Sequence, residues 1–366
     1  MRKTFRRGLT ATFASAAVLA LVVPSAIADT GPMRDDNDPM NASVQSNYSN
    51  TAHLFRVAGP DRVDTAIKLM NASSKRWGKT FILARSDDFP DALAGGPLAD
   101  VYNAPILLTA PGDTVDPRVV AAAQAKGFTK VIILGGTGVI TEVAEVKLQP
   151  LFETTRMRGV DRYETAKNIA LEVVKKVTNE GVNKRTVNVY LATGMNFPDG
   201  LAAGAAAADN DGVVLLTEDY KMNMEFTYKF LKRQYDTLTQ YLNGIEIHTV
   251  GGQAEGAARS SIEDIRDTNT GKDRYETAAM LFGKYKHTPK KVAIVSGEGF
   301  ADAVSAGGWV SNHDGALLLT DNASLNSYTQ AALGSYYAGH ADIVVVGGTA
   351  SVSMNVSNQL AALMTW

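Results

Sequence analysis

Three arginines follow an aspartate in a recurring motif, and their chemistry is suited to binding an anion. The motif Gly-x-Asp-Arg carries Arg62, Arg162 and Arg274 and runs each time into a helical pattern. The aspartate is a favoured helix N-cap. The arginine either pairs with a neighbouring acid or contacts an anion beside the helix N-terminus, where backbone amides and the helix dipole favour negative charge. The residues alone leave both interpretations open.

Two further arginines stand in front of these motifs. Arg56 and Arg156 each precede the aspartate by five residues, and Thr268 takes this place in the third copy. We therefore expect the third copy to lack a charge contact. The first copy also departs from the other two, because Val63-Asp64 replaces Tyr-Glu.

A second aspartate recurs in the sequences Phe89-Pro90-Asp91, Phe197-Pro198-Asp199 and Phe300-Ala301-Asp302, spaced 108 and 103 residues apart. A carboxylate at the end of a strand could serve a catalytic site. However, the alanine- and glycine-rich residues that follow it in all three copies are typical of a structural turn, and we expect each aspartate to cap its helix. No catalytic residue is predicted.

Other kinds of site have little support. The chain has no cysteine, and its five histidines recur at no common position, so no metal site is predicted. Gly135-Gly136-Thr137-Gly138 lacks the lysine of a phosphate-binding loop, and no cofactor is predicted. The net charge is −2, which argues against a nucleic-acid partner.

Short apolar runs alternate with helical patterns in each copy. Such runs, rich in β-branched residues and bounded by polar ones, predict buried parallel strands joined by right-handed crossovers. The predicted strands are 80–84, 105–109 and 131–136, then 187–192, 213–217 and 245–252, then 292–296, 316–320 and 343–348. The fold class is therefore α/β, with small parallel sheets in three tandem repeats. Ligands are expected at the carboxyl ends of the strands.

The N-terminus predicts export. Four basic residues precede an apolar stretch and the small residues Ala26-Ile27-Ala28, as in a secretory signal peptide over residues 1–28. Its removal would change the net charge from −2 to −6 and leave no membrane span. Residues 29–50 predict a disordered spacer. Repeats of about a hundred residues follow, at 51–150, 151–263 and 264–366.

The order of four motifs, repeated three times over residues 54–366, resembles the type 2 cell-wall-binding repeats of Gram-positive bacteria. These motifs are the Asp-Arg opening, the Phe-Pro-Asp turn, a Leu-Leu-Thr strand end and a strand ending in Gly-Gly. The resemblance implies Rossmann- or Toprim-like repeats packed as an intramolecular pseudo-trimer. It also implies that anionic wall polysaccharide, a teichoic acid-like polymer, binds in grooves between repeats. Carried onto this chain, the ligand-binding residues are Arg62, Arg162 and Arg274, with Arg56 and Arg156 as helpers.

The resulting hypothesis is an exported, non-catalytic protein held at the cell wall or cell surface. Two alternatives stay open. One is a hydrolase or amidase acting on the wall, and the other is an adhesive surface-layer protein that binds another protein. The sequence leaves the oligomeric state undetermined.

Overall fold

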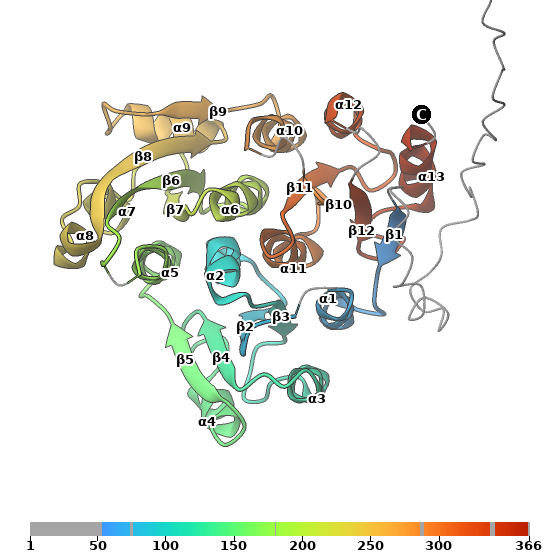
Figure 1. Cartoon of the computed structure of the whole chain (residues 1–366), viewed down its shortest axis with the longest axis horizontal. Coiled ribbons are helices and arrows are strands. Elements are labelled where there is room, and N and C mark those ends of the chain that lie inside the picture. Colours follow the sequence, from blue (N-terminus) through green and yellow to red (C-terminus); the bar gives the residue numbers. More distant parts are fainter. Residues whose placement is uncertain (1–52, 74–75, 180, 286–288, 337–340, 365–366) are drawn as a thin grey trace, which may run out of the picture. The chain divides into compact units, whose positions relative to one another are not determined.

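The computed structural model describes residues 53–364 except 74–75, 180, 286–288 and 337–340 (Figure 1). The predicted signal peptide and spacer lie outside the described residues, so both stay predictions. No helix in the described part of the chain is long and apolar enough to cross a membrane.

The described residues form strands that alternate with helices in each repeat. The first repeat contains β1 (Leu54–Val57), α1 (Arg62–Asn71), β2 (Thr80–Arg85), a 3-10 turn (Pro90–Ala92), α2 (Gly95–Tyr102), β3 (Ile106–Thr109), α3 (Pro117–Ala125), β4 (Lys130–Leu134) and α4 (Glu142–Leu148). The second contains β5 (Glu153–Met157), α5 (Arg162–Val177), β6 (Arg185–Thr193), α6 (Pro198–Asp209), β7 (Val213–Thr217), α7 (Thr227–Leu231), α8 (Asp236–Tyr241), β8 (Leu242–Val250) and α9 (Gly252–Arg259). The third contains β9 (Asp267–Asn269), α10 (Arg274–Tyr285), β10 (Lys291–Ser296), α11 (Phe300–Ser311), β11 (Gly315–Thr320), α12 (Ser327–Tyr336), β12 (Asp342–Val346) and α13 (Met354–Leu363).

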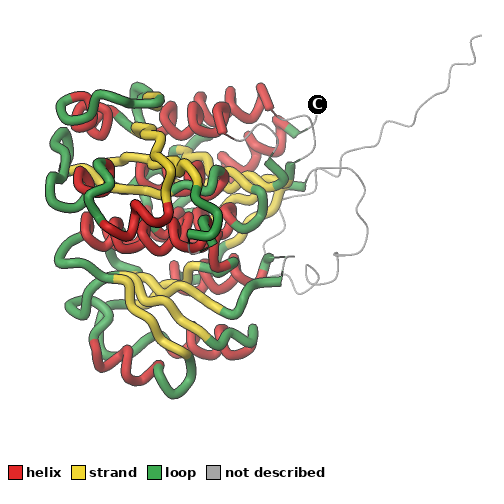
Figure 2. The backbone as a smooth tube through the Cα atoms, turned by 60° about the vertical axis from the view of Figure 1, so that its left-hand side comes forward, coloured by secondary structure: helices red, strands yellow, loops and turns green. Residues whose placement is uncertain are grey.

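The strands form three parallel sheets of four strands each, which confirms the predicted fold class. Their orders are β3-β2-β4-β5, β7-β6-β8-β9 and β1-β12-β10-β11. Helices lie on either side of the strands (Figure 2). The central strands β2, β4, β10 and β12 are buried except for one end residue each, as expected for sheets covered on both faces.

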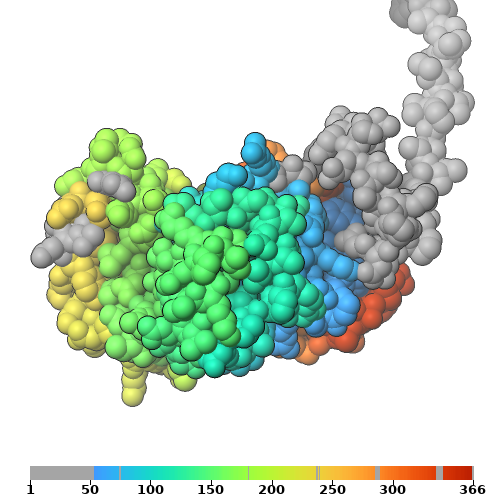
Figure 3. Space-filling view, turned by 90° about the horizontal axis from the view of Figure 1, so that it is seen from below, coloured from blue at the N-terminus to red at the C-terminus, as the bar shows by residue number. Residues whose placement is uncertain are grey.

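Each sheet takes one edge strand from the next repeat. β5 opens the second repeat yet pairs with β4 of the first, and β9 of the third repeat pairs with β8 of the second. β1, at the start of the first repeat, pairs with β12 of the third. The first repeat therefore lies beside the third, as the adjacent blue and red residues of Figure 3 show. The three repeats close on one another without a covalent link between the first and the last.

The two arginines that precede the Asp-Arg motifs lie on these exchanged strands. Arg56 on β1 donates to the carbonyl oxygen of Gly347 at 2.6 Å and to the hydroxyl of Ser357 at 2.7 Å, both in the third repeat. Arg156 on β5 likewise donates to the carbonyl oxygen of Gly135 at 2.9 Å, and its Nε donates to Glu145 at 2.7 Å. Each arginine thus fastens an edge strand to the glycine turn and last helix of the preceding repeat.

The third edge strand is fastened by other side chains, because Thr268 replaces the arginine on β9. The carboxylate of its neighbour Asp267 contacts Nδ1 of His248 on β8 at 2.8 Å and Nζ of Lys284 on α10 at 3.0 Å. This polar cluster joins the second and third repeats where the arginine is missing.

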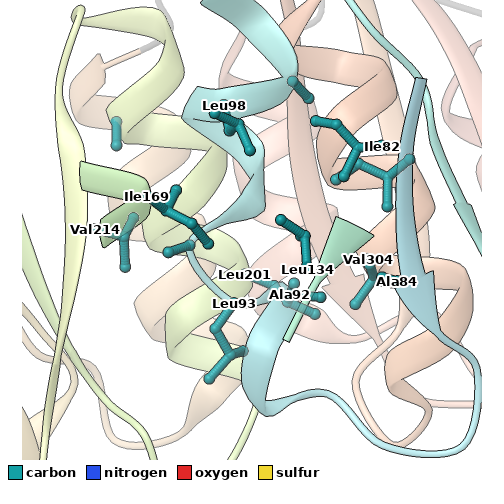
Figure 4. Packing of buried hydrophobic residues seen from close by; sticks show 14 of the residues in the cluster. Ile82, Ala84, Ala92, Leu93, Leu98, Leu134, Ile169, Leu201, Val214 and Val304 are labelled. Atoms are coloured by element: carbon teal, nitrogen blue, oxygen red, sulfur yellow. The ribbon is translucent and has the colours of Figure 1, made fainter. Parts of the chain in front are cut away.

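Equivalent helices α2, α6 and α11 pack against one another where the three repeats meet. Their small residues permit this contact, as predicted: a Cβ atom on Gly96 would lie 2.9 Å from the carbonyl oxygen of Gly204. Figure 4 shows the surrounding core, to which each repeat contributes, with Leu93, Leu201 and Val304 in equivalent positions. One core therefore spans all three repeats.

The repeat-opening helices begin as predicted, because Asp61, Asp161 and Asp273 each accept backbone N–H groups of the first helical turn. In the second and third repeats a glutamate also accepts the N–H group of the residue before the aspartate: Glu164 from Val160 and Glu276 from Lys272. The first repeat has Pro60 in that place, and proline has no N–H group to satisfy. Its shorter Asp64 instead pairs with Arg118 at 2.8 Å.

A second change in the first repeat is also compensated by packing. The rings of Tyr163 and Tyr275 lie against Gly194 and Gly297, where a Cβ atom would crowd the first ring and clash with the second. The first repeat has Val63 in place of tyrosine and Ser86 in place of glycine. The smaller side chain on the helix therefore makes room for the larger residue at the strand end.

Replacing Arg56 by alanine should destabilise the protein by about 2–4 kcal/mol, because it leaves buried acceptors of the third repeat without their donor. Urea unfolding followed by circular dichroism measures this loss. Arg76→Ala is the matched control, since Arg76 is exposed on the same repeat. An Arg56→Ala protein as stable as the control would contradict the role of Arg56 in closing the repeats.

Gly297→Ser should cost about 1–3 kcal/mol by crowding Tyr275. Adding Tyr275→Val should recover much of this loss, because the first repeat carries the same valine and serine. A double-mutant cycle by thermal unfolding measures the coupling, and Gly334→Ser, in open space on α12, is the control. Strictly additive losses would refute the proposed compensation.

Candidate functional site

The arginines of the three Asp-Arg motifs have the same anchorage. Nη1 of Arg62, Arg162 and Arg274 donates to a carbonyl oxygen at the end of the repeat's first internal strand, at 2.5 Å in each case. The acceptors are Ser86, Gly194 and Gly297. In the described part of the chain the other guanidinium nitrogens have no hydrogen-bond acceptor. Each arginine is therefore oriented by one bond and keeps donors for another partner.

Each arginine also reaches the Phe-Pro-Asp motif of the preceding repeat. The guanidinium carbon of Arg62 lies 5.6 Å from the ring centroid of Phe300, and that of Arg274 lies 5.9 Å from the ring centroid of Phe197. The charges of Arg62, Arg162 and Arg274 act on Asp302, Asp91 and Asp199, respectively. The two sequence motifs thus meet at three junctions, each formed by consecutive repeats, with the third repeat followed by the first.

The phenylalanines of the three motifs contact one another. The ring centroids of Phe89, Phe197 and Phe300 are 5.9, 5.9 and 6.3 Å apart, with the planes inclined by about 60°. Tilted aromatic pairs at this spacing stabilise a contact beyond the area that they bury. This cluster fixes the three arginine-bearing junctions relative to one another.

The aspartates of these motifs do not cap their helices, so that prediction is wrong. α6 and α11 have no side-chain cap, and neither has the 3-10 turn that contains Asp91. Instead each carboxylate lies against the first glycine of the Gly-Gly turn, namely Gly135, Gly251 or Gly347. These glycines have positive φ angles of 94°, 83° and 109°, and a Cβ atom on any of them would collide with the carboxylate.

Burial raises the pKa of all three carboxyl groups. The effect is largest for Asp199, where burial raises the pKa to about 6 although the charge of Arg274 opposes it. For Asp91 and Asp302, burial is opposed by a nearby hydroxyl, Thr165 or Ser351, as well as by arginine. The negative charge that faces each arginine is therefore poorly solvated.

The first junction is the one between the first and second repeats, and the other two follow in chain order. A cavity lies between β5 and α5 of the second repeat, and Lys175 in its lining is near the end of α5 opposite to Arg162. Its volume is about 320 Å³, and its charged lining residues are Arg156, Arg158, Lys175 and the acidic Glu172. The repeat pattern did not predict Arg158, because the residue before the motif glycine is alanine in the first repeat and threonine in the third. Lys175 was not singled out from the sequence either. Comparing the repeats for basic residues found in only one copy would have identified Arg158.

The structure separates the five predicted ligand-binding arginines into two groups. Arg62 is exposed, and Arg162 and Arg274 are half-buried at the junctions. By contrast, Arg56 is only 5% exposed and the Arg156 side chain only 6%, and both are enclosed by the partners described above. That any of the five contacts a ligand stays a prediction, and Arg56 and Arg156 have little surface left for one.

Clusters suited to catalysis or metal binding are sparse in the described residues. No group of three or more histidine, aspartate or glutamate side chains there could hold a metal ion. Ser73 Oγ lies 2.7 Å from Nε2 of His313, a distance suited to a nucleophile and its base. However, His313 is 3% exposed, and its ring stacks on that of Trp309. This pair belongs to the packing between α1 and α11.

Comparison with known proteins finds two relatives in Bacillus subtilis. It is 28% identical over 319 residues to the amidase enhancer of Bacillus subtilis (strain 168), covering 85% of this chain and 41% of that protein. It is 24% identical over 308 residues to the N-acetylmuramoyl-L-alanine amidase LytC of the same organism, covering 83% of this chain and 57% of LytC. The chain thus spans about half the length of these relatives.

Two solved structures have a similar fold. Cwp6 from Clostridium difficile superimposes with a TM-score of 0.71 at 21% identity, covering 86% of this chain and 50% of Cwp6. Cwp8 from the same organism gives 0.69 at 21% identity, covering 85% of this chain and 51% of Cwp8.

A family model matches three successive segments, residues 56–145, 156–256 and 269–357, which together make up most of the chain. Each segment runs from an edge-strand residue, through the Asp-Arg and Phe-Pro-Asp motifs, to a residue beyond the glycine turn. The chain belongs to the family of cell wall binding domain 2 (CWB2) proteins.

Proposed function

We propose that this protein attaches non-covalently to the cell wall by binding an anionic wall polymer at the junctions between its repeats. The observation that carries the proposal is the threefold recurrence of an arginine held by one bond, whose remaining donors have no acceptor among the described residues. The family supports a cell wall polymer as the partner and the wall or cell surface as the location. Export through the N-terminal signal peptide is part of this proposal.

Several weak sites suit a repeating polymer. An exposed or half-exposed arginine binds a single phosphate or carboxylate weakly in water, because solvent and salt screen the charge. Once one site is occupied, neighbouring anions of the same chain are held near the remaining sites at high effective concentration. Three arginines fixed relative to one another by the phenylalanine cluster would therefore bind a polymer much more tightly than its monomer.

The junctions are not equivalent. The first one has Arg162, and the cavity with Arg158 and Lys175 lies between β5 and α5 of the same repeat. The third has Arg62, which is more exposed than its counterparts and lies beside Val63 rather than a tyrosine. We expect the polymer to make more polar contacts at the first junction than at the third.

An enzyme that acts on the wall is the main alternative, because one relative is an amidase. We propose that the described repeats are non-catalytic. His313 of the Ser73–His313 pair is buried, and the motif carboxylates lie against glycine backbone. Release of wall fragments by the purified protein that disappears on Asp199→Asn would instead favour the enzyme.

Combined replacement of Arg62, Arg162 and Arg274 by alanine should weaken binding to isolated Gram-positive cell walls by at least about tenfold. Co-sedimentation with walls measures this loss. The wild-type protein should also dissociate as ionic strength rises from about 0.05 to about 0.5 M. The charge-matched control replaces Arg76, Lys79 and Lys126, which are exposed near the opposite, amino ends of the strands.

Walls stripped of their anionic polymer provide the decisive comparison. The proposal requires that binding be lost on stripped walls and retained by the control triple variant. Undiminished binding to stripped walls would refute it and favour an adhesive protein that recognises another wall component. Capture of a wall protein from those stripped walls would identify this chain as an adhesive protein that binds another protein.

Replacing Arg158 and Lys175 by alanine tests the cavity between β5 and α5 separately. We expect a smaller loss of wall binding, about threefold, because these residues add charge in one repeat of three. The double variant Lys126→Ala plus Arg76→Ala is the control, and equal binding by both double variants would exclude the cavity from the polymer site.

A further inference from the structure

The junction between the second and third repeats contains an unusually isolated carboxylate. Asp199 is the second residue of α6, is 9% exposed, and lies against the backbone of Gly251. Hydroxyl groups lower the pKa of Asp91 and Asp302, whereas burial and Arg274 are the causes that act on the pKa of Asp199. In the described part of the chain no hydrogen-bond donor reaches the Asp199 carboxylate.

Among the described residues, the charge that acts on this carboxylate is that of Arg274. α6 packs against α2, α10, α11 and the strands β6, β7, β8 and β11. Of the ionisable groups that these elements carry, Arg274 on α10 is the one whose charge acts on Asp199. Asp199 titrates near pH 6, because burial disfavours its charge more strongly than Arg274 favours it.

The same arginine is the proposed contact for the polymer. Its Nη1 is held by Gly297 and its guanidinium lies over the ring of Phe197, which belongs to the same motif as Asp199. An anion bound to Arg274 therefore lies near a second negative charge while Asp199 is ionised. Like charges in a poorly solvated site repel each other, so the anion and the Asp199 carboxylate compete for one arginine.

We propose that proton uptake by Asp199 strengthens polymer binding at this junction, so that attachment tightens in mildly acidic surroundings. This inference rests on the proposed function. A neutral Asp199 leaves the charge of Arg274 to the ligand, and the bound anion in turn favours the protonated carboxyl group. Binding and protonation are therefore reciprocally linked.

The sign of the effect follows from the raised pKa. Above about pH 7 the folded protein carries the Asp199 charge, and the polymer meets repulsion at this junction. As the pH falls through about 6 the carboxyl group becomes neutral and the repulsion disappears. We expect affinity to rise about three- to tenfold between pH 7.5 and pH 5.5, the range for one partly screened charge contact.

The experiment measures binding of poly(glycerol phosphate), whose phosphodiesters keep their charge over this range, to the purified protein at both pH values. Asp199→Asn should bind at pH 7.5 about as tightly as the wild type does at pH 5.5, and should lose most of the pH dependence. Asp264→Asn is the charge-matched control, because it removes the same charge from an exposed side chain outside the three motifs. Thermal unfolding of each variant verifies its fold.

Calorimetry in two buffers of different ionisation enthalpy gives a readout that needs no variant. The wild type should take up protons when it binds the polymer near pH 6. Binding without proton uptake, or pH dependence retained in Asp199→Asn, would overturn the inference and leave wall attachment intact. Failure to bind both the polymer and native walls at either pH would overturn the inference and the proposed function together.

Discussion

The exchange of edge strands between repeats is the constraint on which the rest of the structure depends. A three-stranded α/β unit would expose the unpaired edge of its third internal strand, and here the following repeat supplies the missing strand. For the sheet of the third repeat that strand is β1, so a strand of the first repeat completes the last sheet. Four residues separate β1 from Arg62, and the same strand pairing that closes the sheets therefore positions an arginine at each junction. Structural closure and the proposed ligand contact therefore depend on one short segment of each repeat.

The first repeat shows how departures from a motif can preserve a structure. Judged from the sequence, Val63 and Asp64 suggest a weakened junction. In the structure, a second substitution compensates for each of these changes. Pro60 has no N–H group, so the glutamate that accepts this group in the second repeat is not needed. Ser86 occupies the space that the smaller Val63 leaves. The anchorage of Arg62 to its strand end is the same as in the other repeats. The remaining difference is the lost tyrosine ring, which alters the surface next to the arginine rather than its position.

The sequence predicted the buried strands, the fold class and the aspartate caps, because each depends on local pattern. The edge strands β1, β5 and β9 were not predicted, since they are short and β5 and β9 are largely polar, so their stability comes from pairing with a distant strand. The enclosure of Arg56 and Arg156 depends on those pairings and was equally hidden. Capping by Asp199 and its counterparts was expected from residue type. This prediction was wrong because each carboxylate instead lies against the Gly-Gly turn about fifty residues later in the chain.

The buried aspartates lower the stability of the folded protein at neutral pH, and packing alone does not explain why they are present. A carboxylate whose pKa is raised by burial destabilises the folded state at neutral pH, because the unfolded chain holds the charge in water. Asparagine has nearly the same shape and would avoid this cost, yet all three repeats carry aspartate. In each repeat the carboxylate is within electrostatic reach of the arginine that we assign to the polymer. Its charge weakens a site that would otherwise be more positive, and proton uptake reverses this effect. A function in adjusting anion affinity therefore accounts for an acid where stability would favour an amide.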